Sequence, residues 1–491
     1  MLQGWRLKVS KLFLIPQRYV LGIMGLLAVC NAYTMRVCLN LAVTQMVNNT
    51  KDAESHFDPD ACPDDSEIFA NGTVTLKPHA IFDWSESTQG LILSGFYYGY
   101  AITHVPGGYL AERYGGKWTL GIGLLSTAIF TLMTPVVVKA GGATWLFILR
   151  VLQGMGEGPT MPALMIVLAR WVPPHERSRQ GALVFGGAQI GNIFGSFMSG
   201  FLMAGGGDWA NVFYFFGCFG IFWFIAWSIF CYSTPNTHPF ISDKELKYLN
   251  ETVTSAETAS VRDPVPWKAI VRSVPVWALL FAAVGHDWGY YTMVTDLPKY
   301  MTDVLKFNIA TTGTLTAMPY LAMWISAFLF GWACDFCVKP ATGPAICIIL
   351  ASYAGCDRFA AVAYFIASMA LMGGFYSGMK VNALDLAPNY AGSLTAMING
   401  TSTISGIITP YLIGLLTPDS TLVQWRTAFW VCFAVLVGTN VIYCIWADGK
   451  QQWWDDVRQY GYPADWKHGP LKTSDVDKEK SKKSETKGTS L

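Results

Sequence analysis

The sequence predicts an all-α membrane protein in which about twelve transmembrane helices form two similar six-helix bundles. Of its 491 residues, 52% are hydrophobic and only 14% are charged, whereas a soluble globular domain carries about 25% charged residues. So few charges cannot cover a water-facing surface of this size. Apolar runs of about 20 residues, the length that a bilayer requires of a helix, recur along the chain. The charged residues lie between these runs.

Twelve apolar runs account for the predicted helices. The first six cover residues 19–47, 88–111, 118–138, 144–171, 180–204 and 211–232. The second six cover residues 274–298, 311–334, 341–354, 359–386, 391–416 and 426–446. The chain therefore divides into an N-terminal bundle at 19–232, a middle loop at 233–273 and a C-terminal bundle at 274–447. Arg36 and Asn40 inside the first run, and the lack of a small-residue cleavage site after it, predict a retained helix and not a secretory signal.

Lysine and arginine residues in the short loops predict the orientation. They concentrate in residues 1–18, after the fourth run and in the middle loop, which places these segments and the tail at 448–491 in the cytoplasm. The tail is polar and highly charged from about residue 467 and is expected to be disordered. The long loop at 48–83 then lies outside, and its two sequons predict glycosylation of Asn48 and Asn71.

The net charge of +1 excludes attraction of the whole chain to nucleic acid, so membrane lipid and a small solute are the expected partners. Cys62 and Cys356 both fall on the predicted outer side, where oxidation is permitted, and we expect them to form a disulfide. Cys334 and Cys337 have the spacing of a metal motif, but a lone pair without other ligands is poor evidence for zinc. We expect no metal, no cofactor and a monomeric protein.

A polar motif follows the second run of each bundle. The first copy, residues 108–117, reads GYLAERYGGK and contains Glu112, Arg113 and Lys117; the second, residues 331–335, ends at Asp335. In both copies a glycine precedes a carboxylate by four residues, which suits a breakable latch between neighbouring helix ends. Asp385, near the predicted cytoplasmic end of the tenth run, is a further gating or anchoring candidate. The motif resembles the cytoplasmic loop signature of the major facilitator superfamily, with Glu112 where aspartate is commoner.

Other segments resemble one branch of that superfamily. They are residues 99–109 (GYAITHVPGGY), 150–158 (RVLQGMGEG), 173–178 (PPHERS), 238–241 (HPFI) and 384–390 (LDLAPNY). This branch comprises the anion symporters that include type I sodium/phosphate cotransporters, sialin and the vesicular glutamate transporters. Residues 286–288 and 295–300 are most similar to sialin and to the insect-type inorganic phosphate cotransporters. The vesicular glutamate transporters carry an arginine where this chain has His286 and a histidine where it has Leu93, which argues against glutamate as the substrate.

The resemblance implies a secondary active transporter that moves inorganic phosphate or organic carboxylates by cation-coupled symport and alternating access. Sodium or a proton is the coupling ion, and the plasma membrane or a vesicular or lysosomal membrane is the location. A proton-coupled, sialin-like exporter of acidic sugars or amino acids is the alternative within the family. A multi-span membrane enzyme or a receptor is the alternative from another class. The ninth run is short, so that helix is either broken or thin, or the sequence is a variant lacking a segment.

Three ionisable residues lie deep inside predicted helices, where such residues usually mark a substrate pathway. At about 1.5 Å per residue, Arg36 is roughly 16 Å, Arg150 about 9 Å and Glu157 about 20 Å from the outer end of its run. Arg150 and Glu157 are seven residues apart and therefore share a helix face. We expect both arginines to attract an anion and Glu157 to pair with one of them until a cation neutralises it. The alternative is a permanent pair that only fixes helix packing.

The seventh run contributes candidates from the second bundle. His286, near mid-membrane, can donate a hydrogen bond to a substrate or titrate, or it can be satisfied by its neighbours. Tyr290, one turn later, and Asn40, one turn after Arg36, are further candidates for substrate binding. The resemblance implies roles of this kind for Arg36, Arg150 and Glu157, the positions at which this chain matches the family's arginines and glutamate.

Overall fold

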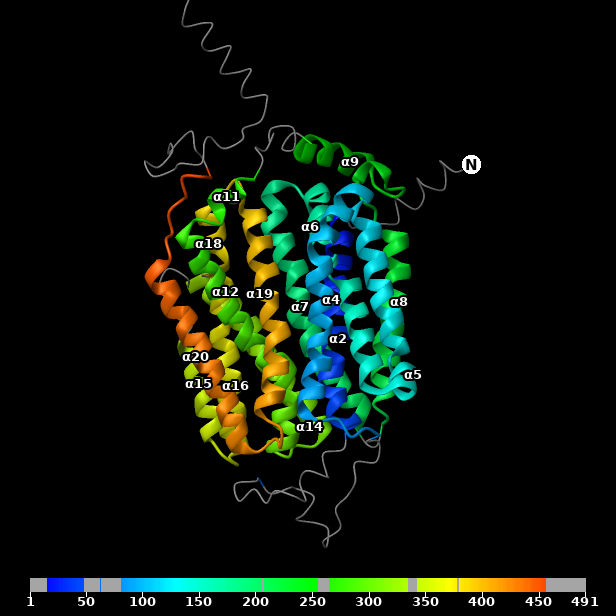
Figure 1. Ribbon diagram of the computed structural model, residues 1–491. Coiled ribbons are helices and arrows are strands. Elements are labelled where there is room, and N and C mark those ends of the chain that lie inside the picture. Colours follow the sequence, from blue (N-terminus) through cyan, green and yellow to red (C-terminus); the bar gives the residue numbers. More distant parts are fainter. Residues whose placement is uncertain are drawn as a thin grey trace, which may run out of the picture.

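Two helical bundles stand side by side in the computed structural model (Figure 1). The structure describes residues 16–47, 62, 81–204, 207–254, 265–333, 342–377 and 379–455. The first bundle consists of α2 (Gln17–Met46), α4 (Glu86–Tyr114), α5 (Gly116–Glu157), α6 (Thr160–Trp171), α7 (Pro174–Met203) and α8 (Ala210–Phe230). A linker follows with η2 (Pro235–Thr237), α9 (Asp243–Leu249), η3 (Asn250–Thr254) and α11 (Trp267–Ile270).

The second bundle contains more helical segments than apolar runs. They are α12 (Val274–Tyr291), η4 (Thr292–Asp296), α13 (Leu297–Lys299), η5 (Tyr300–Val304), α14 (Ile309–Ala333), α15 (Thr342–Tyr353), α16 (Arg358–Met372), α17 (Gly374–Ser377), α18 (Met379–Leu386), α19 (Ala391–Leu416) and α20 (Leu422–Trp446). The eleventh run, at 391–416, coincides with α19. The tenth run divides into α16, α17 and α18. The described part of the ninth helix, α15, has 12 residues, or about 18 Å, against a hydrocarbon core of about 30 Å.

The fourth and seventh runs differ from the expected helices because of prolines. The fourth breaks after Glu157, where Pro159, which has no N–H and a fixed φ, separates α5 from α6. The third and fourth runs meet at Gly142, whose φ of 62° reverses the chain between them. The seventh run continues past Pro298 to Val304, because two wide π-helical turns, η4 and η5, flank the proline and absorb the distortion.

The bundles place apolar side chains outward and polar ones inward. Four segments of the described ranges have by themselves the length and hydropathy of a membrane span: Gln17–Met46, Gly116–Trp171, Ala210–Phe230 and Leu422–Trp446. Large apolar side chains such as Phe222 and Ile445 are 70% and 69% exposed. Asn31, Thr131 and Asn192 are buried. This distribution suits a molecule surrounded by lipid.

The linker is held against the first bundle at the end where α2 begins, which the loop charges predict to be cytoplasmic. Glu245 of α9 accepts hydrogen bonds from the backbone N–H of Gln17 at 2.9 Å and from that of Arg18 at 3.2 Å. His238 accepts the backbone N–H of Phe240 at Nδ1 and contacts the carbonyl oxygen of Phe230 through Nε2. Burial lowers the pKa of His238, which matches a neutral ring with both nitrogens engaged.

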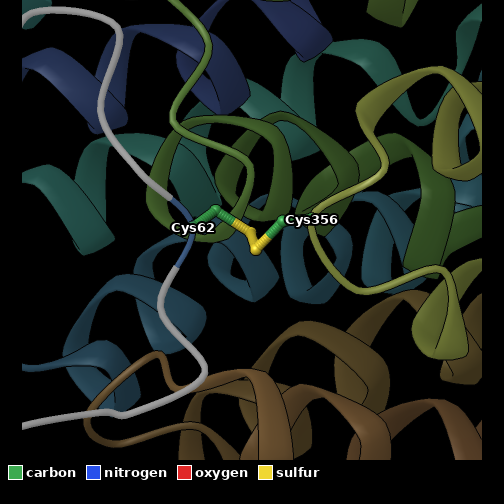
Figure 2. The surroundings of a disulfide bond; sticks show 2 residues. All are labelled: Cys62 and Cys356. Carbon is green, nitrogen blue, oxygen red and sulfur yellow. A yellow bond between two sulfur atoms is a disulfide. The ribbon is translucent and has the colours of Figure 1, made fainter. Parts of the chain in front are cut away.

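A disulfide joins the two bundles (Figure 2). It lies at the end that the loop charges predict to face outside, which we call the outer end. Cys62, from the long loop after α2, bonds to Cys356 in the turn between α15 and α16, with their Cα atoms 5.2 Å apart. This is the disulfide expected from the outer position of both cysteines. The predicted glycosylation sites Asn48 and Asn71 lie outside the described residues.

We expect Cys356→Ala to lower the apparent melting temperature of the detergent-solubilised protein. The bond links residues 294 positions apart, and such a crosslink lowers the entropy of the unfolded chain, which stabilises the folded state by about 2–4 kcal/mol. Tryptophan fluorescence during heating, with and without dithiothreitol, measures this. Cys218→Ala, which removes an exposed free thiol, is the control. Equal melting temperatures for Cys356→Ala and the oxidised parent would contradict a stabilising bond.

Candidate functional site

Arg36 and Glu157 form a buried ion pair near the middle of the first bundle. Arg36 lies on α2, and Glu157 is the last residue of α5 before the break at Pro159. Nη2 of Arg36 donates to Oε1 of Glu157. The side chains are only 7% and 2% exposed. Such a pair is strongly held while both partners are charged, because removal of one charge leaves the other buried without compensation.

Aromatic rings enclose both guanidinium groups. The Arg36 guanidinium carbon lies 4.4 Å from the ring centre of Tyr33, 4.8 Å from that of Phe96 and 5.1 Å from that of Tyr100. The Arg150 guanidinium carbon lies 5.0 Å from the ring centre of Phe96. Phe96 therefore contacts both cations. Ring faces stabilise cations without neutralising them, so the two arginines keep their attraction for anions.

Arg150 has no acidic hydrogen-bond partner among the described residues. Its Nη2 donates to the backbone carbonyl of Arg36 at 3.2 Å, and its Nη1 donates to Oε1 of Gln153 at 3.1 Å. The amide of Gln153 is in turn oriented by the hydroxyls of Thr131 and Thr134. Among the described residues, Nε of Arg36, Nε of Arg150 and Oε2 of Glu157 are buried without a hydrogen-bond partner. Two cations with donors to spare and one competing carboxylate fit a site for an anion with several oxygens.

The remaining candidates fall in two places. Tyr290 and Asn40 lie at the seam between the bundles: Asn192 Nδ2 donates to the Tyr290 hydroxyl at 2.7 Å, and Asn40 Nδ2 donates to the carbonyl of Val294 at 2.7 Å. The His286 ring stacks on Phe375 of α17 with centres 3.8 Å apart. Its Nδ1 is 3.1 Å from Oδ1 of Asp287.

A second buried ion pair links the two bundles at their outer end, and the sequence reasoning missed it. Lys299 of α13 donates to Glu86, the first residue of α4. Their side chains are 3% and 4% exposed. Gln89 Nε2 donates to the other Glu86 oxygen at 3.0 Å. Each charge lies at the edge of an apolar run, where a charged side chain usually faces the water at the membrane surface. Only the packing of the two bundles therefore reveals the pair.

Glycines let the bundles approach closely around this pair. A Cβ added to Gly90 of α4 would lie 2.3 Å from the carbonyl oxygen of Pro410 in α19. A Cβ added to Gly200 of α7 would lie 2.8 Å from the Cα of Gly313 in α14. All four positions are in the outer halves of their helices, as are the Tyr290 and Asn40 contacts. The bundles are thus packed together from mid-depth to the outer end.

The predicted latch residues lie at the opposite end. Arg113 is exposed and donates from Nη1 to the Tyr109 hydroxyl of its own helix at 3.3 Å. Lys117 is buried and donates to the carbonyl of Ser228 in α8 at 2.8 Å. Asp385 is exposed on α18. Asp335 and the side chain of Glu112 lie outside the described part of the chain.

Comparison with known proteins agrees with this architecture. A family profile described as "Major Facilitator Superfamily" matches residues 25–314 and 297–476. The chain is 38% identical to a "Putative inorganic phosphate cotransporter" of Drosophila melanogaster, covering 89% of this chain and 86% of that protein. It is 37% identical to human sialin, covering 89% and 90% respectively. A D-xylose-proton symporter shares the fold with a TM-score of 0.66 at 13% identity, covering 88% of this chain and 98% of its own.

We expect Glu86→Gln or Lys299→Gln alone to lower the melting temperature, because each leaves a buried charge unpaired at a cost of about 3–5 kcal/mol. The double variant should recover much of that loss, since neither charge remains. Lys247→Gln is the control, because the Lys247–Glu251 pair is 79% and 66% exposed and such pairs contribute about 0–1 kcal/mol. Strictly additive single and double effects would show that the two charges are not coupled.

Proposed function

Because this chain belongs to the Major Facilitator Superfamily, we propose that it moves a small anion, inorganic phosphate or an organic carboxylate, together with a cation. The single observation that carries the proposal is the Arg36–Glu157 pair beside Arg150 in the buried centre of the first bundle. The relatives named "Putative inorganic phosphate cotransporter" and "Sialin" support anions as the substrate class. The chain is an integral, multi-pass membrane protein and a transporter, which removes the enzyme and receptor alternatives.

The anion competes with Glu157 for Arg36. When a proton or sodium ion neutralises Glu157, the pair loses its electrostatic attraction and the Arg36 guanidinium becomes available to a substrate oxygen. Arg150 supplies a second set of donors from α5, and the Phe96 ring contacts both guanidinium groups. Asn40, Tyr290 and His286 complete the site from the seam and from α12. Cation and anion therefore bind together, and each raises the affinity for the other.

Alternating access follows from the way in which the bundles meet. Interactions between the bundles cluster at the outer end, around Glu86–Lys299 and the glycine contacts. We infer that this arrangement is closed toward the outside, and that rocking of the bundles about the central arginines opens that end while the latch motifs close the other. Since the central cations all lie within one chain, a monomer suffices.

Uptake into proteoliposomes tests the substrate. We expect the protein to accumulate labelled phosphate, sialate or a dicarboxylate under an imposed pH or sodium gradient, varied separately. Arg150→Lys should reduce uptake at least tenfold, because an ammonium cannot reproduce the planar set of donors. Arg426→Lys, which alters an arginine on α20 bound to the carbonyl of Ser352, is the control. No accumulation of any of these anions under either gradient would refute the proposal.

Glu157→Gln tests the coupling. The amide mimics a permanently neutral carboxyl, so we expect exchange of anion against anion to continue while accumulation no longer responds to the cation gradient. Uptake should therefore lose its dependence on pH, if a proton is coupled, or on sodium. Glu251→Gln, at an exposed cytoplasmic position, should behave as wild type. Coupling that persists unchanged in Glu157→Gln would mean that the pair serves only helix packing.

A further inference from the structure

The side chain of Gln153 lies between Arg150 and the first half of α5. Gln153 is one helical turn after Arg150, and both residues are buried. Arg150 donates from Nη1 to Oε1 of Gln153 at 3.1 Å. The amide nitrogen of Gln153 lies 3.3 Å from the hydroxyl oxygen of Thr131 and 3.4 Å from that of Thr134. The amide thus connects a central arginine to two residues that precede the reversal at Gly142.

The two threonines determine which way this amide faces. The Thr131 hydroxyl donates to the carbonyl oxygen of Thr127 at 2.7 Å. The Thr134 hydroxyl donates to the carbonyl oxygen of Phe130 at 3.0 Å. A hydroxyl has a single hydrogen, so each threonine oxygen can only accept from the amide of Gln153. The amide must therefore turn its NH2 group toward the threonines and its oxygen toward the guanidinium.

Close packing of the two halves of α5 holds Gln153 in this place. The Thr127 hydroxyl donates to the backbone carbonyl oxygen of Gln153 at 3.1 Å. Three residues after Gln153, the halves approach closely, because a Cβ added to Gly123 would lie 2.4 Å from the carbonyl oxygen of Gly156. A shift of the backbone that carries the amide would therefore require the two halves to separate.

An uncharged acceptor affects Arg150 differently from a carboxylate. The amide oxygen satisfies one guanidinium N–H and leaves the positive charge in place. With Glu157 ionised, Arg36 and Arg150 contribute two positive charges against one negative charge, so the net charge of the three is +1. A carboxylate in place of the Gln153 amide would bring this sum to zero. It would also give Arg150 an ion-pair partner that competes with an anion.

We propose that Gln153 is a positioning residue for anion binding, which holds the Arg150 guanidinium through an uncharged acceptor and so leaves its charge available to the substrate. Thr131 and Thr134 support this role by fixing the orientation of the amide. Gln153 acts through Arg150 and not by contact with the anion. The inference rests on the proposed anion transport and adds to it the residue that keeps the charge of Arg150 uncompensated.

Exchange of labelled anion across proteoliposomes without an ion gradient tests this role. Phosphate, sialate and succinate are assayed separately, and each assay gives KM and the maximal rate. For the anion that wild type exchanges best, we expect Gln153→Glu to raise KM about tenfold or more, because a charge-assisted hydrogen bond of Arg150 to the anion is lost. The maximal rate should change less than KM. Gln452→Glu, which follows α20 and keeps an acceptor for Ser273, should match wild type.

Melting temperatures of the detergent-solubilised variants test the effect on Arg150 without transport. Gln153→Glu should be at least as stable as wild type, because its carboxylate compensates a buried cation. Gln153→Leu should melt at a lower temperature, since a guanidinium N–H loses its acceptor. A KM within about twofold of wild type in Gln153→Glu would overturn the proposal. A melting temperature of Gln153→Glu below that of Gln153→Leu would do the same.

Threonine variants test the orientation of the amide independently. Thr131→Val combined with Thr134→Val removes both acceptors at similar volume, so KM should rise. Thr131→Ser combined with Thr134→Ser keeps both hydroxyls and should retain the wild-type KM. Thr427→Val, at an exposed position of α20, is the control. Equal KM values for the valine and serine pairs would refute the role of the threonines.

The two kinds of measurement also separate this proposal from the proposed function. If wild type exchanges none of the three anions, the proposed anion transport fails. The order of melting temperatures among wild type, Gln153→Glu and Gln153→Leu still decides whether Gln153 holds Arg150 through an uncharged acceptor.

Discussion

Two guanidinium groups buried within one helical bundle impose the constraint around which the rest of the molecule is arranged. A charge in a low-dielectric interior must be compensated, and Glu157 compensates only one of two. The remaining positive charge is shared among ring faces, backbone carbonyls and the amide of Gln153, all of which stabilise a cation without removing its charge. A permanently satisfied pair would need no second arginine. The surplus positive charge attracts an anion to the site.

The second buried pair, Glu86–Lys299, has a different consequence because its partners belong to different bundles. Separation of the bundles at that end breaks it, whereas the Arg36–Glu157 pair moves as part of one bundle. Close glycine contacts between α4 and α19 and between α7 and α14 accompany it, so polar and steric complementarity coincide at the outer end. The disulfide between Cys62 and Cys356 also joins the two bundles at that end.

The sequence alone identifies a buried charged residue where its own helix determines its burial. Arg36, Arg150 and Glu157 interrupt apolar runs, and their positions along the runs predicted that Arg36 lies at a depth between those of the other two. It did not find Glu86 and Lys299, because a charge at the edge of a run has the same local pattern whether it faces water or a partner. It also ended the seventh helix at Pro298, since a proline usually ends a helix, whereas two π turns flank this proline and carry the helix on to Val304.

Composition, run length and loop charge were sufficient to determine that this chain crosses a membrane many times in two similar halves, because the bilayer forces each segment to satisfy its backbone within itself. This requirement applies to each segment separately, so the apolar runs of the sequence reveal it without a structure. The tertiary structure alone decided which arginine pairs with Glu157 and which helices meet at the outer end. These pairings depend on how helices that are distant in the sequence are rotated and packed against one another. The residue pattern of one helix does not determine which face of another helix it contacts.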